Sequence, residues 1–221
     1  MKPVKILCLA DEVDLLVYSP SIKERFGDAD LILSAGDLPE EYLGYVSAML
    51  NRPMLSVAGN HDSDVHPASI RQPAHEGITP GDSCGLGRLR FSIAEEAGIS
   101  VLGIPGCMRY SGGPNQFSEL YMRLKVLSLA PLLLLRRLLT GRGVDIILAH
   151  SPPKGIGDAA DLPHRGFSSF LWLIKLAKPV YFIHGHVHVY DARQGRELRL
   201  GDTLVVNVYG HRILKLEGAA R

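Results

Sequence analysis

The chain has 221 residues, with 24 Lys and Arg against 23 Asp and Glu, and a formal net charge of +1. This length suits one large domain with a sizeable core, and we expect residues 1–221 to form a single domain. The balanced charge gives no electrostatic footprint for nucleic acid, and the three cysteines have neither the even number of a disulfide framework nor the CxxC spacing of a zinc site.

Short apolar runs alternate with helical patterns along the chain. In chain order, the expected strands are 4–10, 30–35, 53–58, 99–104, 144–149, 179–184 and 203–209, with a last one near 212–216. The expected helices are 20–26, 39–50, 116–139 with an interruption at Pro131, and 167–177. Nearly continuous apolar strands are typical of sheets covered on both faces, and their alternation with helices predicts a layered α/β architecture.

Two segments stand out from this alternation. Residues 60–88 are rich in Gly, Pro, Ser and His, and a loop of this length in a compact domain is usually functional or mobile. The apolar stretch 126–135 is only about half of the ~20 residues that a membrane-spanning helix needs. We expect a core or lid helix there, with contact to a membrane or a partner as the alternative. Because the N-terminus lacks a signal-peptide pattern, we expect a cytoplasmic protein with no membrane partner.

Side chains able to bind a metal ion follow five of the expected strands. Taken alone, each Asp or Asn is explained as a turn former and each His as a half-buried ring. In open α/β sheets, however, ligands bind outside the carboxyl ends of the strands, so five such ends together favour a functional site. The residues are Asp11, Asp37, Asn60 with His61, His150, and His186 with His188.

The motifs GD, GNHD and GHVH, with Asp11 before them and His150 between the last two, resemble those of the calcineurin-like metallophosphoesterase superfamily. The segments HSPPKGIGD and KPVYFIHGHVH are more similar to its small phosphodiesterase-like branch than to its protein phosphatases. The resemblance implies a four-layer αββα sandwich with two metal ions at the central strand ends. It also implies a ligand set in which Asp37 bridges both ions, Asn60, His150 and His186 complete one site, and Asp11 and His188 serve the other.

The chemistry of these residues agrees with the resemblance. Carboxylate, amide and imidazole groups together suit Mn²⁺, Fe²⁺ or Zn²⁺ better than Ca²⁺. Two such ions can clamp a phosphoryl group and generate hydroxide, while His61, directly after Asn60, assists the leaving group as the candidate catalytic residue. We therefore expect a metal-dependent phosphoester hydrolase acting on a phosphodiester or a small phosphorylated molecule. The alternative is a non-catalytic metal-binding scaffold or interaction protein on the same fold, and the oligomeric state stays open.

The first motif departs from the family pattern, because Val13 stands where the family has a histidine. In an extended segment, residues 11 and 13 share one side, so we expect Val13 to face the site without coordinating. Glu12 and Asp14 would need a kink to reach the metal and are otherwise solvated turn residues. We therefore expect the site made by Asp37, Asn60, His150 and His186 to bind its ion more tightly than the site that Asp11 serves.

A second departure concerns the substrate. Where protein phosphatases of the superfamily carry GDxxDR, this chain has GDLPEE, so Glu41 replaces the phosphate-binding Arg and argues against a protein phosphatase. Glu40 is a candidate to orient His61, although an acid in the first turn of a helix also interacts favourably with the helix dipole alone.

The loop after the 99–104 strand offers other substrate ligands. Arg109 is the candidate phosphate ligand, with a plain surface arginine as the alternative, and Tyr110 is a weaker candidate to stack on a base or aryl group. His164, in the loop beyond His150, is expected at the mouth of the site, as a support for the metal ligands or in contact with substrate.

Overall fold

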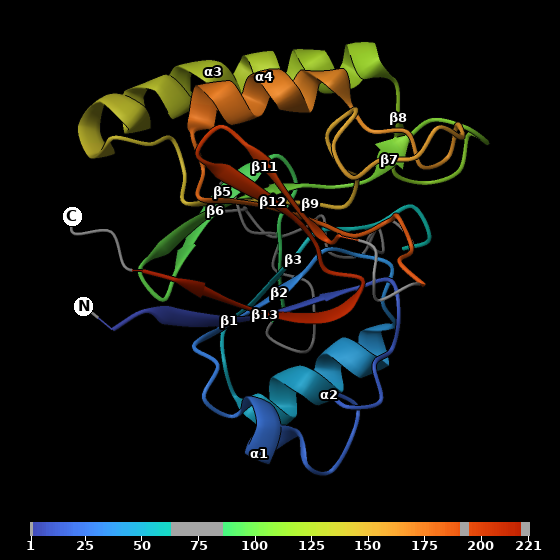
Figure 1. The fold of residues 1–221 in the computed structure, drawn as a ribbon, viewed down its shortest axis with the longest axis vertical. Helices are drawn as coiled ribbons and strands as arrows, with labels where there is room; N and C mark the ends of the chain where they lie inside the picture. The colour runs from blue at the N-terminus through green and yellow to red at the C-terminus, as the bar shows by residue number, and fades with distance from the viewer. Residues whose placement is uncertain (1, 63–85, 191–194, 218–221) are drawn as a thin grey trace, which may run out of the picture.

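The computed structural model describes residues 2–62, 86–190 and 195–217. Most of the predicted 60–88 loop, with His66, His75 and Cys84, lies outside these residues. The described chain forms two main sheets and four helices (Figure 1). Among the described residues, no helix combines the length and the apolar content needed to cross a bilayer.

The first sheet has the strand order β13-β1-β2-β3-β4. Strands β1 to β4 pair in parallel, and β13 is antiparallel to β1 at the edge. The register places Ile6 beside Leu31 and Cys8 beside Leu33. The strands are β1 (Val4–Ala10), β2 (Leu31–Ser34), β3 (Met54–Ser56), β4 (Leu86–Arg88) and β13 (Gly210–Leu216).

The second sheet has the order β11-β12-β10-β9-β6-β5, with a parallel centre and an antiparallel strand at each edge. A short parallel pair, β7–β8, lies beside it (Figure 1). The strands are β5 (Ser92–Glu96), β6 (Ile99–Ile104), β7 (Cys107–Met108), β8 (Gln116–Phe117), β9 (Ile146–Ala149), β10 (Tyr181–His184), β11 (Glu197–Leu200) and β12 (Thr203–Asn207).

Helices cover the outer face of each sheet, so the layers run helix, sheet, sheet, helix (Figure 1). Helices α1 (Ile22–Phe26) and α2 (Glu40–Leu50) lie on the first sheet, and α3 (Glu119–Thr140) and α4 (Ser168–Ala177) on the second. The predicted four-layer αββα sandwich is confirmed.

The alternation of side chains along each strand builds three separate apolar layers. In β1, Ile6 and Cys8 point into the cluster between the two sheets, whereas Leu7 and Leu9 pack against α1 and α2. A third cluster lies between the second sheet and α3 with α4. Because both faces of the central strands are buried, their sequences are nearly continuously apolar.

Helix α3 differs from the predicted 116–139 helix with its interruption. Residues 116–117 form β8, Ser118 caps the helix by accepting a hydrogen bond from Tyr121 N, and the helix continues through Pro131 to Thr140. Pro131 is exposed, so water can satisfy the carbonyl that loses its helical partner, while buried Leu133 holds the next turn on the sheet.

Glu119 at the start of α3 joins the two outer helices. No side chain of α4 itself caps its N-terminus, where Phe167 is the N-cap residue. The Glu119 carboxylate instead accepts hydrogen bonds from the backbone N–H groups of Ser168 at 2.9 Å and Ser169 at 2.8 Å. A carboxylate there satisfies two free donors and interacts favourably with the positive end of the helix dipole.

We expect Glu119→Ala to lower the free energy of unfolding by about 1–2 kcal/mol, because two backbone donors of α4 lose their acceptor. Urea denaturation measures the change. The matched control is Glu41→Ala in the first turn of α2, which should cost only about 0.3–0.5 kcal/mol through the helix dipole. Equal effects of the two changes would contradict the capping role.

Candidate metal centre

Glycines bring the carboxyl ends of the strands from both sheets into close contact. A Cβ added at Gly59 would overlap the Asp37 carboxylate and lie 2.7 Å from His150 Cε1. A Cβ at Gly185 would overlap the carboxylate of Asp11. The glycines of the GNHD and GHVH motifs are therefore required for the approach of the acidic residues, in addition to any role in turning the chain.

Three of the predicted ligands have left-handed backbone conformations. The φ angles are 62° at Asp11, 57° at Asp37 and 65° at His186. Each of these residues follows a strand directly or after one or two residues. Such conformations are unfavourable for residues with a Cβ and are concentrated at functional sites, where the surrounding structure holds them.

Four side chains converge on one point between the sheets. One possible metal-ligand atom from each of Asp37, His150 and His186 lies within 4.8 Å of the other two. His150 Nε2 is 3.0 Å from Asn60 Oδ1, 3.0 Å from His186 Nδ1 and 3.3 Å from Asp37 Oδ2. His150 is fully buried, and Asn60 and His186 are almost so. The structure thus brings together all four residues predicted for the tighter site.

Backbone carbonyls fix which nitrogen of each histidine carries hydrogen. His150 Nδ1 lies 2.8 Å from Ala35 O, and His186 Nε2 lies 2.7 Å from Pro163 O. A carbonyl oxygen only accepts, so those two nitrogens are the donors. When both rings are neutral, the remaining atoms, His150 Nε2 and His186 Nδ1, face each other with lone pairs, beside two further oxygen acceptors. This donor set fits a divalent transition-metal ion, and the carbonyls are the orienting partners that histidine ligands require.

The pKa values show the same preference for a positive charge at this point. Burial lowers the pKa of His150, but the hydrogen bond and negative charge of Asp37 outweigh it and raise the pKa to about 9. Burial, with the adjacent His150 charge, lowers the pKa of His186 to about 3. Burial also raises the pKa of the Asp11 carboxyl to about 6. In the metal-free protein, one positive charge is therefore favoured at His150, whose Nε2 then carries a proton where a metal ion would otherwise bind, and a second charge is excluded at His186.

Comparison with known proteins decides the family. The model of the calcineurin-like phosphoesterase family matches residues 7–190, which include all the converging side chains. The chain belongs to the calcineurin-like phosphoesterase family.

One curated protein and two solved structures are similar to this chain. The UPF0046 protein K07C11.7 of Caenorhabditis elegans is 23% identical over 226 residues, covering 92% of this chain and 69% of that protein. One crystal structure matches with a TM-score of 0.63 and 16% identity over 96% of this chain and 95% of the other. The crystal structure of TT1561 of Thermus thermophilus matches with a TM-score of 0.55 and 17% identity, covering 94% of this chain and 90% of that one. These two solved structures share the fold of this chain.

The other two predicted ligands, Asp11 and His188, lie beside the cluster. Both carboxylate oxygens of Asp11 accept from the His186 backbone N–H, at 3.0 and 2.9 Å, so Asp11 holds the turn that presents His186. His188 is exposed, and its Nδ1 lies 2.8 Å from Tyr190 Oη. Within the described ranges, the three-residue cluster of possible ligands includes neither Asp11 nor His188.

The expected orientation of Val13 is wrong. Asp11 has a left-handed conformation and the chain turns after it, so the alternation of an extended strand does not apply. Val13 packs against the apolar cluster between the first sheet and helices α1 and α2, which includes Leu7 and Leu9. Asp14 Oδ2 lies 2.5 Å from His211 Nδ1, and its other oxygen accepts from Leu16 N.

Glu12 and Asp14 line a separate cleft of about 430 Å³, beside Tyr190 and Tyr209. The hydrogen bond and negative charge of Glu12 add to burial in raising the pKa of Tyr209 to about 12. Within the ADEVD segment, Asp11 is therefore the residue whose carboxylate bonds to the metal-ligand cluster, by accepting from the His186 backbone N–H.

The catalytic and substrate-binding candidates, which we call the rim residues, lie at different distances from the centre. They are His61, Tyr110, His164, Glu40 and Arg109. His61 is exposed, and its backbone N–H donates to Asp37 Oδ1 at 2.8 Å. Tyr110 Oη accepts from Asn60 Nδ2 at 3.2 Å, next to the cluster. The ring of His164 lies 5.1 Å from that of His186 between centroids.

The other two rim predictions receive less support. Glu40 has an ion-pair partner in Arg88, 3.7 Å away, and the described contacts do not include one between Glu40 and His61. Arg109 is exposed, and its backbone N–H bonds to Phe117 O. The phosphate-binding role of Arg109 stays a prediction.

Two residues that shape the site were missed from the sequence. Asp62 Oδ2 accepts from the backbone N–H groups of Asp37 at 3.0 Å and Gly59 at 2.8 Å, and so ties the GD and GNHD turns together. Buried Asn115 donates from Nδ2 to Gly59 O and Asp62 O. The GNHD motif itself pointed to Asp62, whereas nothing in the spacing of Asn115 indicated its role.

We expect Gly185→Ala to weaken Mn²⁺ binding about 10- to 100-fold, because the new methyl group displaces Asp11 and with it the His186 turn. Calorimetric titration measures the affinity. Gly195→Ala is the matched control, since a Cβ there meets no atom within 4 Å. Unchanged affinity in Gly185→Ala would mean that Asp11 does not position the site.

We expect the metal-free protein to lose stability between about pH 6.5 and pH 9. The folded-state pKa of His150 is about 9, above its ordinary value of 6.5, so its contribution is fully present below 6.5 and lost as the pH rises through 9. Urea unfolding in EDTA at several pH values tests this. In His150→Ala the slope over this window should largely vanish, and a slope of the same size in that variant would assign it to another group.

Proposed function

We propose that this chain is a metal-dependent phosphoester hydrolase that acts on a phosphodiester or a small phosphorylated molecule in the cytoplasm. The observation that supports it best is the convergence of His150 Nε2 and His186 Nδ1 on the oxygens of Asp37 and Asn60, where the neutral rings present two facing lone pairs. Membership of the calcineurin-like phosphoesterase family supports the same class of reaction.

Mn²⁺, Fe²⁺ or Zn²⁺ would be held by Asp37, Asn60, His150 and His186, and more weakly at a second position by Asp11, Asp37 and His188. When bound, such an ion supplies Lewis-acid stabilisation of phosphate charge and lowers the pKa of bound water. Two observations support the weaker affinity of the second position: the His186 backbone N–H already donates to Asp11, and His188 is exposed.

The chain's own residues bind the ester and supply a proton. His61 leaves the backbone beside Asp37, at the exposed edge of the centre, from where its imidazole donates a proton to the departing oxygen. Tyr110, anchored to Asn60, presents its ring to the leaving group. Arg109, which directly follows β7, is the phosphate ligand, through charge-assisted hydrogen bonds.

His164 completes the rim. Its Nδ1 lies 2.6 Å from Asp161 Oδ2, which fixes the ring beside His186. We place it as a residue that orients substrate or supports the His186 ring.

A non-catalytic metal-binding scaffold is the second candidate. The observation that favours it is the missing first-motif histidine, because Val13 lies in the apolar layer and the ADEVD segment offers the centre no imidazole. Retention of His61 beside Asn60 favours the enzyme, since metal binding alone does not require it.

We expect EDTA-treated protein to leave bis(p-nitrophenyl) phosphate intact and Mn²⁺ to restore hydrolysis. His61→Ala should lower turnover about 10²- to 10⁴-fold with unchanged metal content, because it removes only the proton donor. Asp37→Asn should lose both activity and metal. His211→Gln, outside the centre, is the matched control.

Two outcomes would contradict this proposal. Undiminished turnover after verified metal removal would exclude a metal mechanism. Metal bound at the site without hydrolysis of any ester in a panel of phosphodiesters and small phosphomonoesters would favour the scaffold.

A further inference from the structure

Helix α3 is apolar on two opposite sides. Met122, Val126 and Leu133 are fully buried against the second sheet. On the opposite side, six leucines are each between 46% and 83% exposed. We call this set the leucine face, and its members are Leu120, Leu124, Leu127, Leu134, Leu135 and Leu138.

The leucine face forms one continuous row along the helix. Leu120, Leu124 and Leu127 are spaced by four and three residues, and Pro131 continues the same spacing to Leu134 and Leu138. The row is about 27 Å long at 1.5 Å per residue. A solvent-facing helix side is normally polar, and contiguous exposed apolar surface marks a site of interaction.

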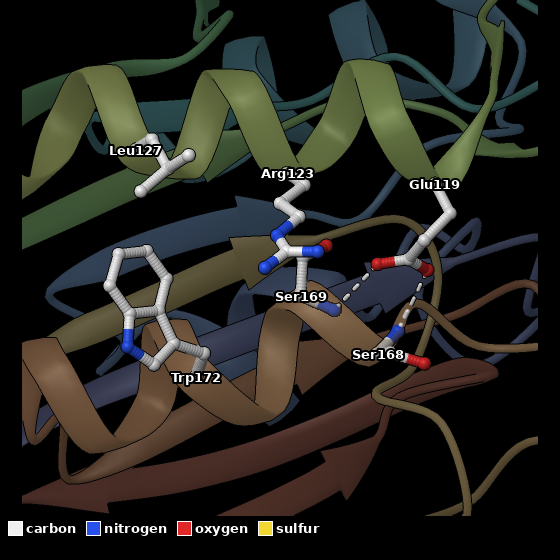
Figure 2. A pocket seen from close by; sticks show the side chains of 6 residues that line it. All are labelled: Glu119, Arg123, Leu127, Ser168, Ser169 and Trp172. Atoms are coloured by element: carbon white, nitrogen blue, oxygen red, sulfur yellow. Dashed lines mark hydrogen bonds between the residues drawn. The ribbon is translucent and has the colours of Figure 1, made fainter.

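Helix α4 extends this surface with an aromatic side chain and a cleft. Trp172 is 41% exposed and lies across from Leu127, with Arg123 reaching between the two helices (Figure 2). The cleft has a volume of about 570 Å³. Ser169 in its lining is only 6% exposed, and its Oγ has no hydrogen-bond partner among the described residues. Glu119 fixes the two helix starts together, so the surface is a preformed platform.

The same layer is strongly cationic. Residues 119–142 contain five Arg or Lys and one acid, and residues 168–178 contain two Lys and no acid, a net charge of +6 in a chain of net charge +1. Arg136 and Arg142 have acidic partners in Glu95 and Asp145. Exposed Arg123, Lys175 and Lys178 are among the remaining cations.

In place of the expected absence of a membrane partner, we propose that the α3–α4 layer docks on an anionic membrane surface. The leucine face and Trp172 lie in the headgroup–acyl boundary, and the cations lie on lipid phosphates. Apolar side chains beside Arg and Lys are the composition of interfacial helices. With the acidic partners Glu95 and Asp145 counted, each copy of the chain would bring a charge of about +4 to the contact, which disfavours a dimer through this face. The layer lies on the side of the molecule opposite α1 and α2 (Figure 1), and the proposal stands independently of the hydrolase activity.

Sedimentation with vesicles tests the proposal on the intact chain. We expect binding to phosphatidylcholine vesicles that contain about one third phosphatidylglycerol, little binding to pure phosphatidylcholine, and weakening as salt rises. Arg123→Gln with Lys175→Gln should weaken binding about thirtyfold. Leu124→Gln with Leu138→Gln should weaken it at least about tenfold.

Matched controls separate the face from general charge and hydrophobicity. Lys23→Gln with Arg25→Gln changes two exposed cations of α1, and Leu15→Gln with Leu198→Gln changes two exposed leucines elsewhere. Neither pair should alter vesicle binding, and circular dichroism confirms that every variant is folded.

The proposal is overturned if the protein binds no vesicles, or if the controls weaken binding as much as the test variants. It is also overturned if light scattering shows a concentration-dependent dimer that Leu124→Gln with Leu138→Gln abolishes while vesicles capture no protein. That last result would assign the face to self-association.

Discussion

The contact between His150 and Ala35 joins the two sheets at the candidate centre. His150 follows β9 in the second sheet, and its Nδ1 donates to the carbonyl of Ala35, which follows β2 in the first, at 2.8 Å. This one bond selects the ring tautomer and points Nε2 at Asp37 and Asn60. The geometry of the centre therefore depends on how closely the sheets approach.

The distance between the sheets is set by their apolar packing and by glycines at the strand ends. The cluster between the sheets consists of aliphatic residues from both, which draws the strand ends together. At those ends, the space where a side chain of Gly59 or Gly185 would lie is filled by the carboxylates of Asp37 and Asp11, respectively. Hydrophobic burial thus supplies the stability that holds carboxylates and imidazoles in an otherwise unfavourable cluster.

The molecule has different chemistry at its strand ends and on its outer helix layer. The strand ends gather acceptor atoms that require a positive charge. The α3–α4 layer contains exposed leucines and cations. Glu119, at the start of α3, links the two helices by accepting hydrogen bonds from the first backbone N–H groups of α4. Residues 107–117, with Arg109 and Tyr110, connect the two regions along the chain. Docking through this layer would fix the orientation of the centre relative to the surface it sits on.

The sequence by itself determined the layered α/β fold and identified the four residues that converge at the candidate centre. Apolar runs identified the central strands because both faces are buried, and the GD, GNHD and GHVH motifs marked strand ends that meet. The small strands β4, β5, β7, β8 and β11 were not predicted, since such short strands carry little hydrophobic pattern.

Only the tertiary structure decided where Val13 points, which groups Asp62 and Asn115 bind, and that the leucine face is exposed. Val13 follows a left-handed Asp11, and one such backbone angle reverses the side that local alternation assigns. Asn115 bonds to residues more than 50 positions away, which no local spacing records. The leucines of α3 have a pattern that suits either a buried or an exposed face, and the choice depends on whether a second layer packs over them.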